Sequence, residues 1–307
     1  MLLRAIAIGL AAALLVHVLL YRRRMMITRA ADHARLPTAP DGIIVGAAPI
    51  ALAGSATHAV LIIHGFGDTT QSVRALADHL HAVHGWTVHV PLLPGHGRTL
   101  ADFDASGSAQ WRAHVRSAYA ALKTTHATVA IVGLSMGGAL ATLEAARDPS
   151  LPALVLLVPY LTPPARAERL APLANLINLM TPYLAGGDRE RSIFDPAARA
   201  HALGYGASPP KRVRDLVTVA HDARFAAADV VAPTLLMHSR TDYRIPLALA
   251  TTHAALFSAA RAREQEWLDG CGHVITVDFG CEHVWAATAE WLARFAGPPA
   301  GVRAQVS

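Results

Sequence analysis

Residues 128–138 read TVAIVGLSMGG, and this stretch decides the fold. Its first part is a run of apolar and β-branched residues, which predicts a buried strand over 128–134. The residues from Met136 onward predict a helix that stops before Pro149. Ser135 therefore stands in a sharp turn between a strand and a helix.

This turn follows the pattern Gly-x-Ser-x-Gly. Gly133 and Gly137 are needed because a Cβ at either position would collide with the neighbouring strand or helix. The turn holds the hydroxyl of Ser135 above the sheet, which is how a nucleophilic serine is presented after a strand. We therefore predict that Ser135 is a nucleophile. The alternative is an idle serine in a glycine-rich turn.

Short apolar segments and longer helical segments alternate along most of the remaining chain. This order is typical of a mostly parallel sheet that is covered by helices. The predicted strands are 58–63, 87–93, 128–134, 153–158, 234–238 and 264–268, and the predicted helices are about 70–84, 108–124, 136–147, 246 onward and 282–296.

The alternation breaks over residues 160–230, which hold several helical pieces and many prolines. Ligands of an open α/β sheet bind at the carboxyl ends of its strands, so we expect this insertion to form a cap over the site. Six apolar residues of the cap indicate either a helix face over the pocket or ordinary contacts between cap and body: Leu170, Leu173, Leu176, Ile177, Leu179 and Met180.

A serine nucleophile needs a general base, and the base needs a partner that orients it. His273 lies in a glycine-rich loop between the last strand and the last helix, so it is the predicted base, with His283 as the alternative. Asp242 follows the strand 234–238 and is the predicted acid, unless it only caps the next helix. Asp269 competes with Asp242, although it lies close to the end of the preceding strand.

Stabilisation of an oxyanion needs two backbone N–H donors. Met136 follows the nucleophile at a helix N-terminus, so its N–H is one predicted donor. Phe66 lies in the loop after the first predicted strand, where Gly65 and Gly67 permit a turn that points its N–H inward. We expect His64, in the same loop, to have a structural role.

Five segments together resemble the carboxylesterase and monoacylglycerol-lipase-like branch of the α/β-hydrolases, also grouped with the serine aminopeptidase-like hydrolases: HGFGD (64–68), PLLPGHG (91–97), GLSMGG (133–138), HSRTDYRIP (238–246) and GCGHVITVD (270–278). They come in family order and cover residues 41–296 between them. The resemblance implies an α/β-hydrolase fold and assigns the site roles as above: Ser135, Asp242 and His273 as the triad, Phe66 and Met136 as the oxyanion donors. The cap shares only its position with that family.

The combined prediction is a serine hydrolase that cleaves carboxylic esters through an acyl-enzyme intermediate. We expect short- or medium-chain acyl esters or monoacylglycerols as substrates. A peptidase or amidase of the same fold is the first alternative, followed by acyl transfer to another alcohol and by a non-catalytic, membrane-tethered binding protein. No cofactor or metal is expected, because the 17 histidines are scattered and form no HExxH motif. The sequence does not specify an oligomeric state.

The N-terminus carries an apolar run over residues 5–20 that is interrupted only by His17. The predicted segments are a membrane anchor over 1–27, a tether over 28–40 and a hydrolase domain over 41–300. A cleaved signal peptide is the alternative, but arginines at 22–24 follow the run where a small-residue cleavage site is expected. Arg4 alone precedes the run, so the charge rule puts the domain on the cytoplasmic side.

The net charge of +5 does not indicate a nucleic-acid-binding protein. The basic residues are nearly all arginines, scattered singly outside the run at 22–24, and no aromatic-interleaved basic patch occurs. Cys271 and Cys281 have no metal-site spacing, and we expect free thiols. Because Cys271 lies two residues before His273, thiol reagents are expected to affect activity.

Overall fold

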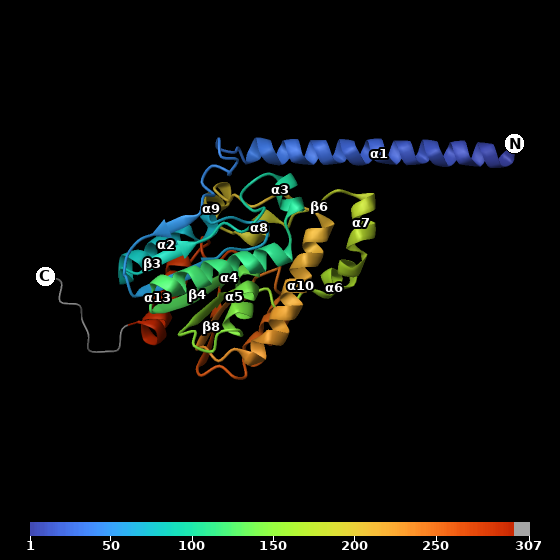
Figure 1. The fold of residues 1–307 in the computed structure, drawn as a ribbon. Coiled ribbons are helices and arrows are strands. Elements are labelled where there is room, and N and C mark those ends of the chain that lie inside the picture. Colours follow the sequence, from blue (N-terminus) through green and yellow to red (C-terminus); the bar gives the residue numbers. More distant parts are fainter. Residues whose placement is uncertain (298–307) are drawn as a thin grey trace.

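The computed structural model describes residues 1–297, and a mostly parallel sheet lies at its centre (Figure 1). Its strands are β1 (Ile50–Leu52), β2 (His58–Ile63), β3 (Thr87–Val90), β4 (Thr128–Leu134), β5 (Leu154–Leu157), β6 (Leu184–Ala185), β7 (Ala207–Ser208), β8 (Thr234–Ser239) and β9 (Arg263–Leu268). Seven strands form the main sheet in the order β1-β3-β2-β4-β5-β8-β9, and β6 pairs with β7 apart from it. In the main sheet β1 runs antiparallel to β3 and every other pair is parallel.

Helices cover the sheet and form the insertion above it. They are α1 (Leu2–Arg35), α2 (Gln71–His84), α3 (Leu100–Ala105), α4 (Ser108–Thr125), α5 (Met136–Ala145), α6 (Ala165–Leu170), α7 (Ala174–Met180), α8 (Arg189–Ser192), α9 (Pro196–Ala200), α10 (Pro210–Ala226), α11 (Leu247–Ala250), α12 (His253–Leu256) and α13 (Cys281–Ala296). Short 3-10 turns lie at Ala171–Leu173 and Ala227–Asp229.

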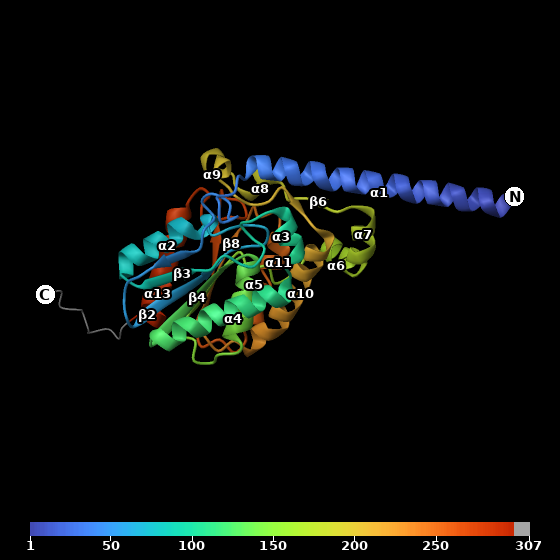
Figure 2. The ribbon, with the colours of Figure 1, turned by 45° about the horizontal axis from the view of Figure 1, so that its top comes forward.

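The sheet is buried on both faces, which explains its apolar strands. In β2, Val60 and Ile62 pack on the side of α2 and α13, while Leu61 and Ile63 pack on the side of α4, α5 and α10 (Figure 2). Strands covered on both faces are apolar at successive positions rather than at alternate ones. The predicted mostly parallel sheet with flanking helices is confirmed.

The predicted strands lie in the sheet with small shifts at their ends. The strand predicted over 87–93 ends at Val90, because Pro91 has no N–H to donate to a neighbouring strand. The helix predicted from 246 onward is divided into α11 and α12. β1 was not predicted from the sequence, since three residues at the sheet edge leave too short a pattern to detect.

The insertion between β5 and β8 contains two parts with different surroundings. Its last helix, α10, packs against α5 on the sheet face and belongs to the main core. The segments before α10 include the paired strands β6 and β7, and they lie on the side of the molecule nearest α1 (Figure 1). Five of these apolar cap residues have exposed side chains and so do not make ordinary buried contacts between cap and body: Leu170, Leu173, Leu176, Leu179 and Met180.

Helix α1 is longer than the predicted anchor and projects beyond the body of the molecule past α7 (Figures 1 and 2). It continues through Arg35, so residues 28–35 of the expected tether are helical. Alanines at positions 30, 31 and 34 favour the helix, and no proline occurs before Pro37. By length and composition α1 is able to cross a membrane.

The cap is attached to α1 by side-chain hydrogen bonds. These join Arg29 Nε to the Tyr183 hydroxyl (2.7 Å), Arg35 Nη2 to the Gly204 carbonyl (2.7 Å), the Gly206 N–H to Asp32 Oδ1 (3.1 Å) and His17 Nε2 to the Leu179 carbonyl (2.9 Å). Because the last of these contacts involves the apolar run itself, the cap lies against both the apolar and the polar parts of the helix.

Candidate active site

Ser135 occupies a strained turn between β4 and α5. Its φ of 55° and ψ of −115° lie in a region that costs a residue with a side chain about 1–3 kcal/mol. A Cβ added to Gly133 would lie 2.6 Å from the Gly138 Cα, and one added to Gly137 would lie 2.7 Å from the His64 carbonyl oxygen. Only glycine fits at these two positions, as the sequence pattern indicated.

The structure brings Ser135, His273 and Asp242 into one hydrogen-bonded series. His273 Nε2 lies 2.9 Å from Ser135 Oγ, and His273 Nδ1 lies 2.7 Å from Asp242 Oδ2. The Asp242 carboxylate can only accept at neutral pH, so Nδ1 carries the ring proton and Nε2 is free to accept the Ser135 hydroxyl proton. Both His273 and Asp242 are buried.

Asp242 remains ionised although it is buried. Burial raises the pKa of its carboxyl, but electrostatic attraction to the neighbouring His273 and the hydrogen bonds that Asp242 accepts outweigh burial and hold the pKa below its ordinary value. These bonds come from His273 and from the N–H groups of Arg244 (2.8 Å) and Ile245 (3.2 Å). A negative charge is therefore fixed behind the imidazole.

The two competing residues from the sequence lie elsewhere. The side chain of Asp269 is 80% exposed and faces Arg240, with 3.5 Å between Oδ1 and Nε. His283 is in the first turn of α13, where its ring is paired with Glu266. Neither residue is part of the hydrogen-bonded series at Ser135.

The loop after β2 lies against Ser135, as the Phe66 prediction requires. A Cβ at Gly65 would be only 3.5 Å from the Ser135 Cβ. Across residues 1–297, the N–H groups of Phe66 and Met136 donate to no backbone or side-chain acceptor. Two unused donors beside Ser135 are suited to bind an oxyanion.

His64 fixes the peptide that carries the Phe66 N–H. The Leu93 N–H donates to His64 Nε2 (3.1 Å), so the ring proton is on Nδ1, which donates to the Gly65 carbonyl (3.0 Å). In a trans peptide the C=O and N–H point in opposite directions. Binding the Gly65 carbonyl therefore directs the Phe66 N–H to the other side. Burial lowers the pKa of His64 to about 4, which keeps this ring neutral.

Two buried polar residues near Ser135, His273 and Asp242 were not predicted from the sequence to have a role in the site. Asp278 is buried beside the His273 loop, and Ser192 of α8 is buried beside Arg244. Asp278 directly follows the apolar run VITV, and a charged residue at the end of such a run could have marked it as a residue with a specific role. No local pattern marks Ser192, because its partners lie far away in the sequence.

Both cysteines are free, as expected. Cys271 is buried, and burial raises the pKa of its thiol. Since the thiolate is the reactive form, the structure argues against the expected sensitivity of Cys271 to thiol reagents. Among the described residues, no group of three or more His, Cys, Asp or Glu side chains could hold a metal ion.

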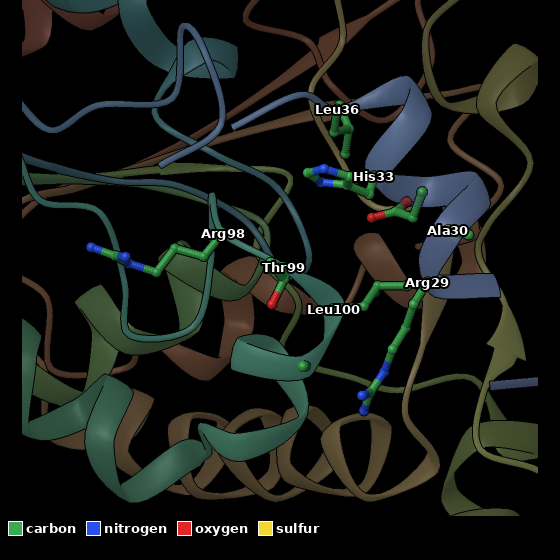
Figure 3. Close-up of a pocket in the computed structure, with 9 residues that line it drawn as sticks. Arg29, Ala30, His33, Leu36, Arg98, Thr99 and Leu100 are labelled. Carbon is green, nitrogen blue, oxygen red and sulfur yellow. The ribbon is translucent and has the colours of Figure 1, made fainter. Parts of the chain in front are cut away.

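A cavity of about 400 Å³ lies apart from the triad, between the end of α1 and the start of α3 (Figure 3). Arg29, His33 and Leu36 line it from one side, and Arg98 and Thr99 from the other. In Figure 3 the side chains of Arg29 and Arg98 extend in different directions. The cavity therefore has no convergent pair of cations for an anionic ligand.

Known proteins are similar to this chain in sequence and in fold. Residues 54–279 match the family model described as serine aminopeptidase, S33. The thermostable monoacylglycerol lipase of Bacillus sp. (strain H-257) is 28% identical over 257 residues, which cover 83% of this chain and 98% of the lipase. The carboxylesterase of Bacillus subtilis (strain 168) is 23% identical over 223 residues, covering 72% of this chain and 86% of the esterase.

A solved structure extends this similarity to three dimensions. It comes from work on LipS and LipT, two metagenome-derived lipolytic enzymes, and superposes with a TM-score of 0.71 at 27% identity. The match covers 82% of this chain and 99% of the solved one. The family model spans most of the sheet and both loops that carry Asp242 and His273. The chain therefore belongs to the serine aminopeptidase S33 family of α/β-hydrolases.

Proposed function

We propose that the chain is a serine hydrolase that cleaves carboxylic esters through an acyl-enzyme intermediate. The observation that carries this proposal is the hydrogen-bonded series from Ser135 through His273 to Asp242. The names of the relatives, a monoacylglycerol lipase and a carboxylesterase, support esters as the substrate class.

Acylation begins when Ser135 Oγ attacks the ester carbonyl carbon. His273 Nε2 accepts the hydroxyl proton, and Asp242 stabilises the imidazolium that forms. The negative charge that develops on the carbonyl oxygen is bound by the N–H groups of Phe66 and Met136. The tetrahedral intermediate then collapses, and His273 returns the proton to the departing alcohol.

Deacylation repeats these steps with water in place of Ser135. His273 removes a proton from water, whose oxygen attacks the acyl carbon, and the acid leaves as the proton returns to Ser135 Oγ. Each proton that His273 accepts is given back within the same half-reaction, so no cofactor is required.

Monoacylglycerols and other medium-chain esters are the proposed substrates, and the membrane is the proposed location. An apolar helix near the N-terminus fits an anchor and a signal sequence alike. We favour an anchor because α1 stays attached to the cap through Arg29, Asp32 and Arg35. The charge rule places the hydrolase domain in the cytoplasm, so protease added to intact cells is expected to leave it uncut.

The test is hydrolysis of p-nitrophenyl esters from C2 to C16 by the full chain in detergent, with Ser135→Ala and the exposed Ser258→Ala as matched variants. Ser135→Ala is expected to lower kcat at least about a thousandfold, and Ser258→Ala to leave it unchanged. An activity that survives Ser135→Ala would refute the nucleophile. If the protein prefers aminoacyl p-nitroanilides, the proposed reaction becomes amide rather than ester cleavage. If its activity is highest on the C2 ester, the proposal of lipid substrates is wrong.

A further inference from the structure

The cap segment 188–195 contacts both loops that carry the proposed base and acid. It contains α8 and lies between strands β6 and β7 in sequence, whereas the two loops follow β8 and β9. The contacts are hydrogen bonds to buried groups rather than surface contacts. They therefore fix the position of the cap segment relative to the triad.

Asp278 makes the first set of these contacts, and only 1% of its surface is exposed. Its carboxylate accepts four backbone N–H groups: those of Gly272 (2.6 Å) and Phe194 (2.8 Å) at Oδ2, and those of Asp195 (2.8 Å) and Phe279 (2.9 Å) at Oδ1. Four donors fill the acceptor capacity of a carboxylate. One side chain thus joins the residue before His273 to two residues of the cap.

Ser192 makes the second set. Its carbonyl accepts the N–H of Val274 (3.0 Å), the residue after His273. Its hydroxyl oxygen accepts hydrogen bonds from Arg244 Nε (3.2 Å) and Nη2 (3.0 Å), and the hydroxyl donates to the Asp188 carbonyl (2.6 Å). The Arg244 N–H in turn donates to Asp242 Oδ1 (2.8 Å). Ser192 thus contacts the base loop directly and the acid through Arg244.

The base is consequently held on both sides by groups that belong to, or bind, the cap. A Cβ on Gly272 would lie 2.6 Å from the Ser192 carbonyl oxygen, so the two backbones pack without space between them. We infer that Asp278 and Ser192 are positioning residues, which set the Ser135–His273–Asp242 geometry from the cap. This inference rests on the proposed function of the triad.

The first test is Asp278→Asn in the full chain. In asparagine an NH₂ group replaces one of the two carboxylate oxygens, and each of these oxygens accepts two N–H groups in Asp278. The NH₂ group is a donor, so it would face two N–H groups that it cannot bind. A shift of about 1 Å at a catalytic group can cost about a hundredfold in rate. We expect kcat for p-nitrophenyl acetate to fall roughly 10- to 100-fold and KM to change less than about threefold. Reaction of Ser135 with a fluorophosphonate should slow in parallel.

The matched control is Asp269→Asn, which removes an exposed carboxylate of the same loop and should leave both rates unchanged. All rates are counted per active site by burst titration, so that loss of folded protein is not read as loss of positioning. Ser192→Ala keeps its carbonyl but loses the Arg244 contacts, and roughly a 3- to 10-fold lower kcat is expected.

The outcomes separate the two proposals. Unchanged kcat per active site in Asp278→Asn and Ser192→Ala, with only a lower unfolding temperature, would overturn the positioning role and leave the triad intact. Ester cleavage that persists in Ser135→Ala would instead overturn the proposed function itself. A parallel fall in kcat and in fluorophosphonate rate, with KM preserved, supports both.

Discussion

Single residues near Ser135 divide into those that we propose to react and those that we propose to direct others. Ser135, His273 and Asp242 are linked by hydrogen bonds of 2.9 and 2.7 Å, which suits proton transfer. The His64 ring makes hydrogen bonds to none of them, yet it fixes the peptide between Gly65 and Phe66. Its contribution to catalysis is therefore indirect and depends on one hydrogen bond to a carbonyl.

Replacing His64 with leucine tests this dependence. The Gly65 carbonyl loses its donor, the Phe66 N–H is no longer directed, and kcat should fall roughly 10- to 100-fold with KM nearly unchanged. The measurement is steady-state hydrolysis of p-nitrophenyl acetate by the folded variant. His201→Leu, at an exposed site, is the control. An unchanged kcat in His64→Leu would show that the loop holds Phe66 without this bond.

At the scale of an element, the turn from β4 to α5 is determined by close packing. The backbone of α5 passes so near the end of β2 that Gly137 has no room for a Cβ beside the Ile63 and His64 carbonyls. This packing fixes the height of Ser135 above the sheet, and the cost of the positive φ at Ser135 is carried by the surrounding core.

Gly137→Ala should therefore lower the free energy of unfolding far more than an alanine at a glycine that has a positive φ but open space around it. We expect a loss of about 3 kcal/mol or more in unfolding free energy for Gly137→Ala. Gly85→Ala, at the left-handed cap of α2 with open space around it, should lose only about 1 kcal/mol. Urea unfolding measures both, and equal losses would contradict the packing argument.

The sequence predicted this element because its signals are local, and for the same reason it marked the three triad candidates, which the structure brings together. The strand, the glycines and Ser135 are neighbours in the chain, and each loop of the site follows a strand. Asp278 and Ser192 have partners far away in sequence, so no period or motif specifies their contacts. Of the two interpretations of the apolar residues in α7, contacts between cap and body do not hold for Leu176, Leu179 and Met180, because apolar spacing identifies a face but not what covers it. The extension of α1 to Arg35 was missed because prolines at 37 and 40 suggested an earlier end.

The whole molecule presents an apolar surface continuous with α1. Three apolar residues of α7 are exposed: Leu176, Leu179 and Met180. The Leu179 carbonyl accepts a hydrogen bond from His17 Nε2 in α1. Because His17 lies within the apolar run, a membrane that surrounds the run also reaches the end of α7. The cap is thereby expected to lie in the interfacial layer of the bilayer.

A Leu176→Asn, Leu179→Asn double variant should keep its activity on soluble p-nitrophenyl acetate. On monoacylglycerol in phosphatidylcholine vesicles, its rate should fall about 5- to 10-fold, since two exposed leucines no longer enter the lipid. Val83→Asn, on an exposed site of α2 away from α1, is the control for a lost apolar side chain. Equal losses on both substrates would argue against lipid contact.

Acid should destabilise the folded molecule before its carboxylates are protonated. Burial lowers the pKa of His64 to about 4, of His238 to about 3 and of His253 to about 4. Because the pKa of these histidines is lower in the folded state, they bind protons in the unfolded chain below about pH 6.5 while they are still neutral in the folded chain. Stability is thus full above that pH and is lost progressively toward pH 4. The unfolding temperature should fall steadily from pH 7 to 4.5, and a constant value would contradict these shifts.

The unbroken course of α1 has a consequence for how the enzyme meets its substrate. From Arg22 to Arg35 the helix adds about 20 Å without a flexible joint, and the cap is bonded along it. With α1 as the proposed membrane anchor, Ser135 would stand at a constant height above the lipid plane and could not search the solution on a tether. Encounter would then be a two-dimensional process, in which turnover is expected to follow the number of ester molecules per unit area of membrane rather than their bulk concentration.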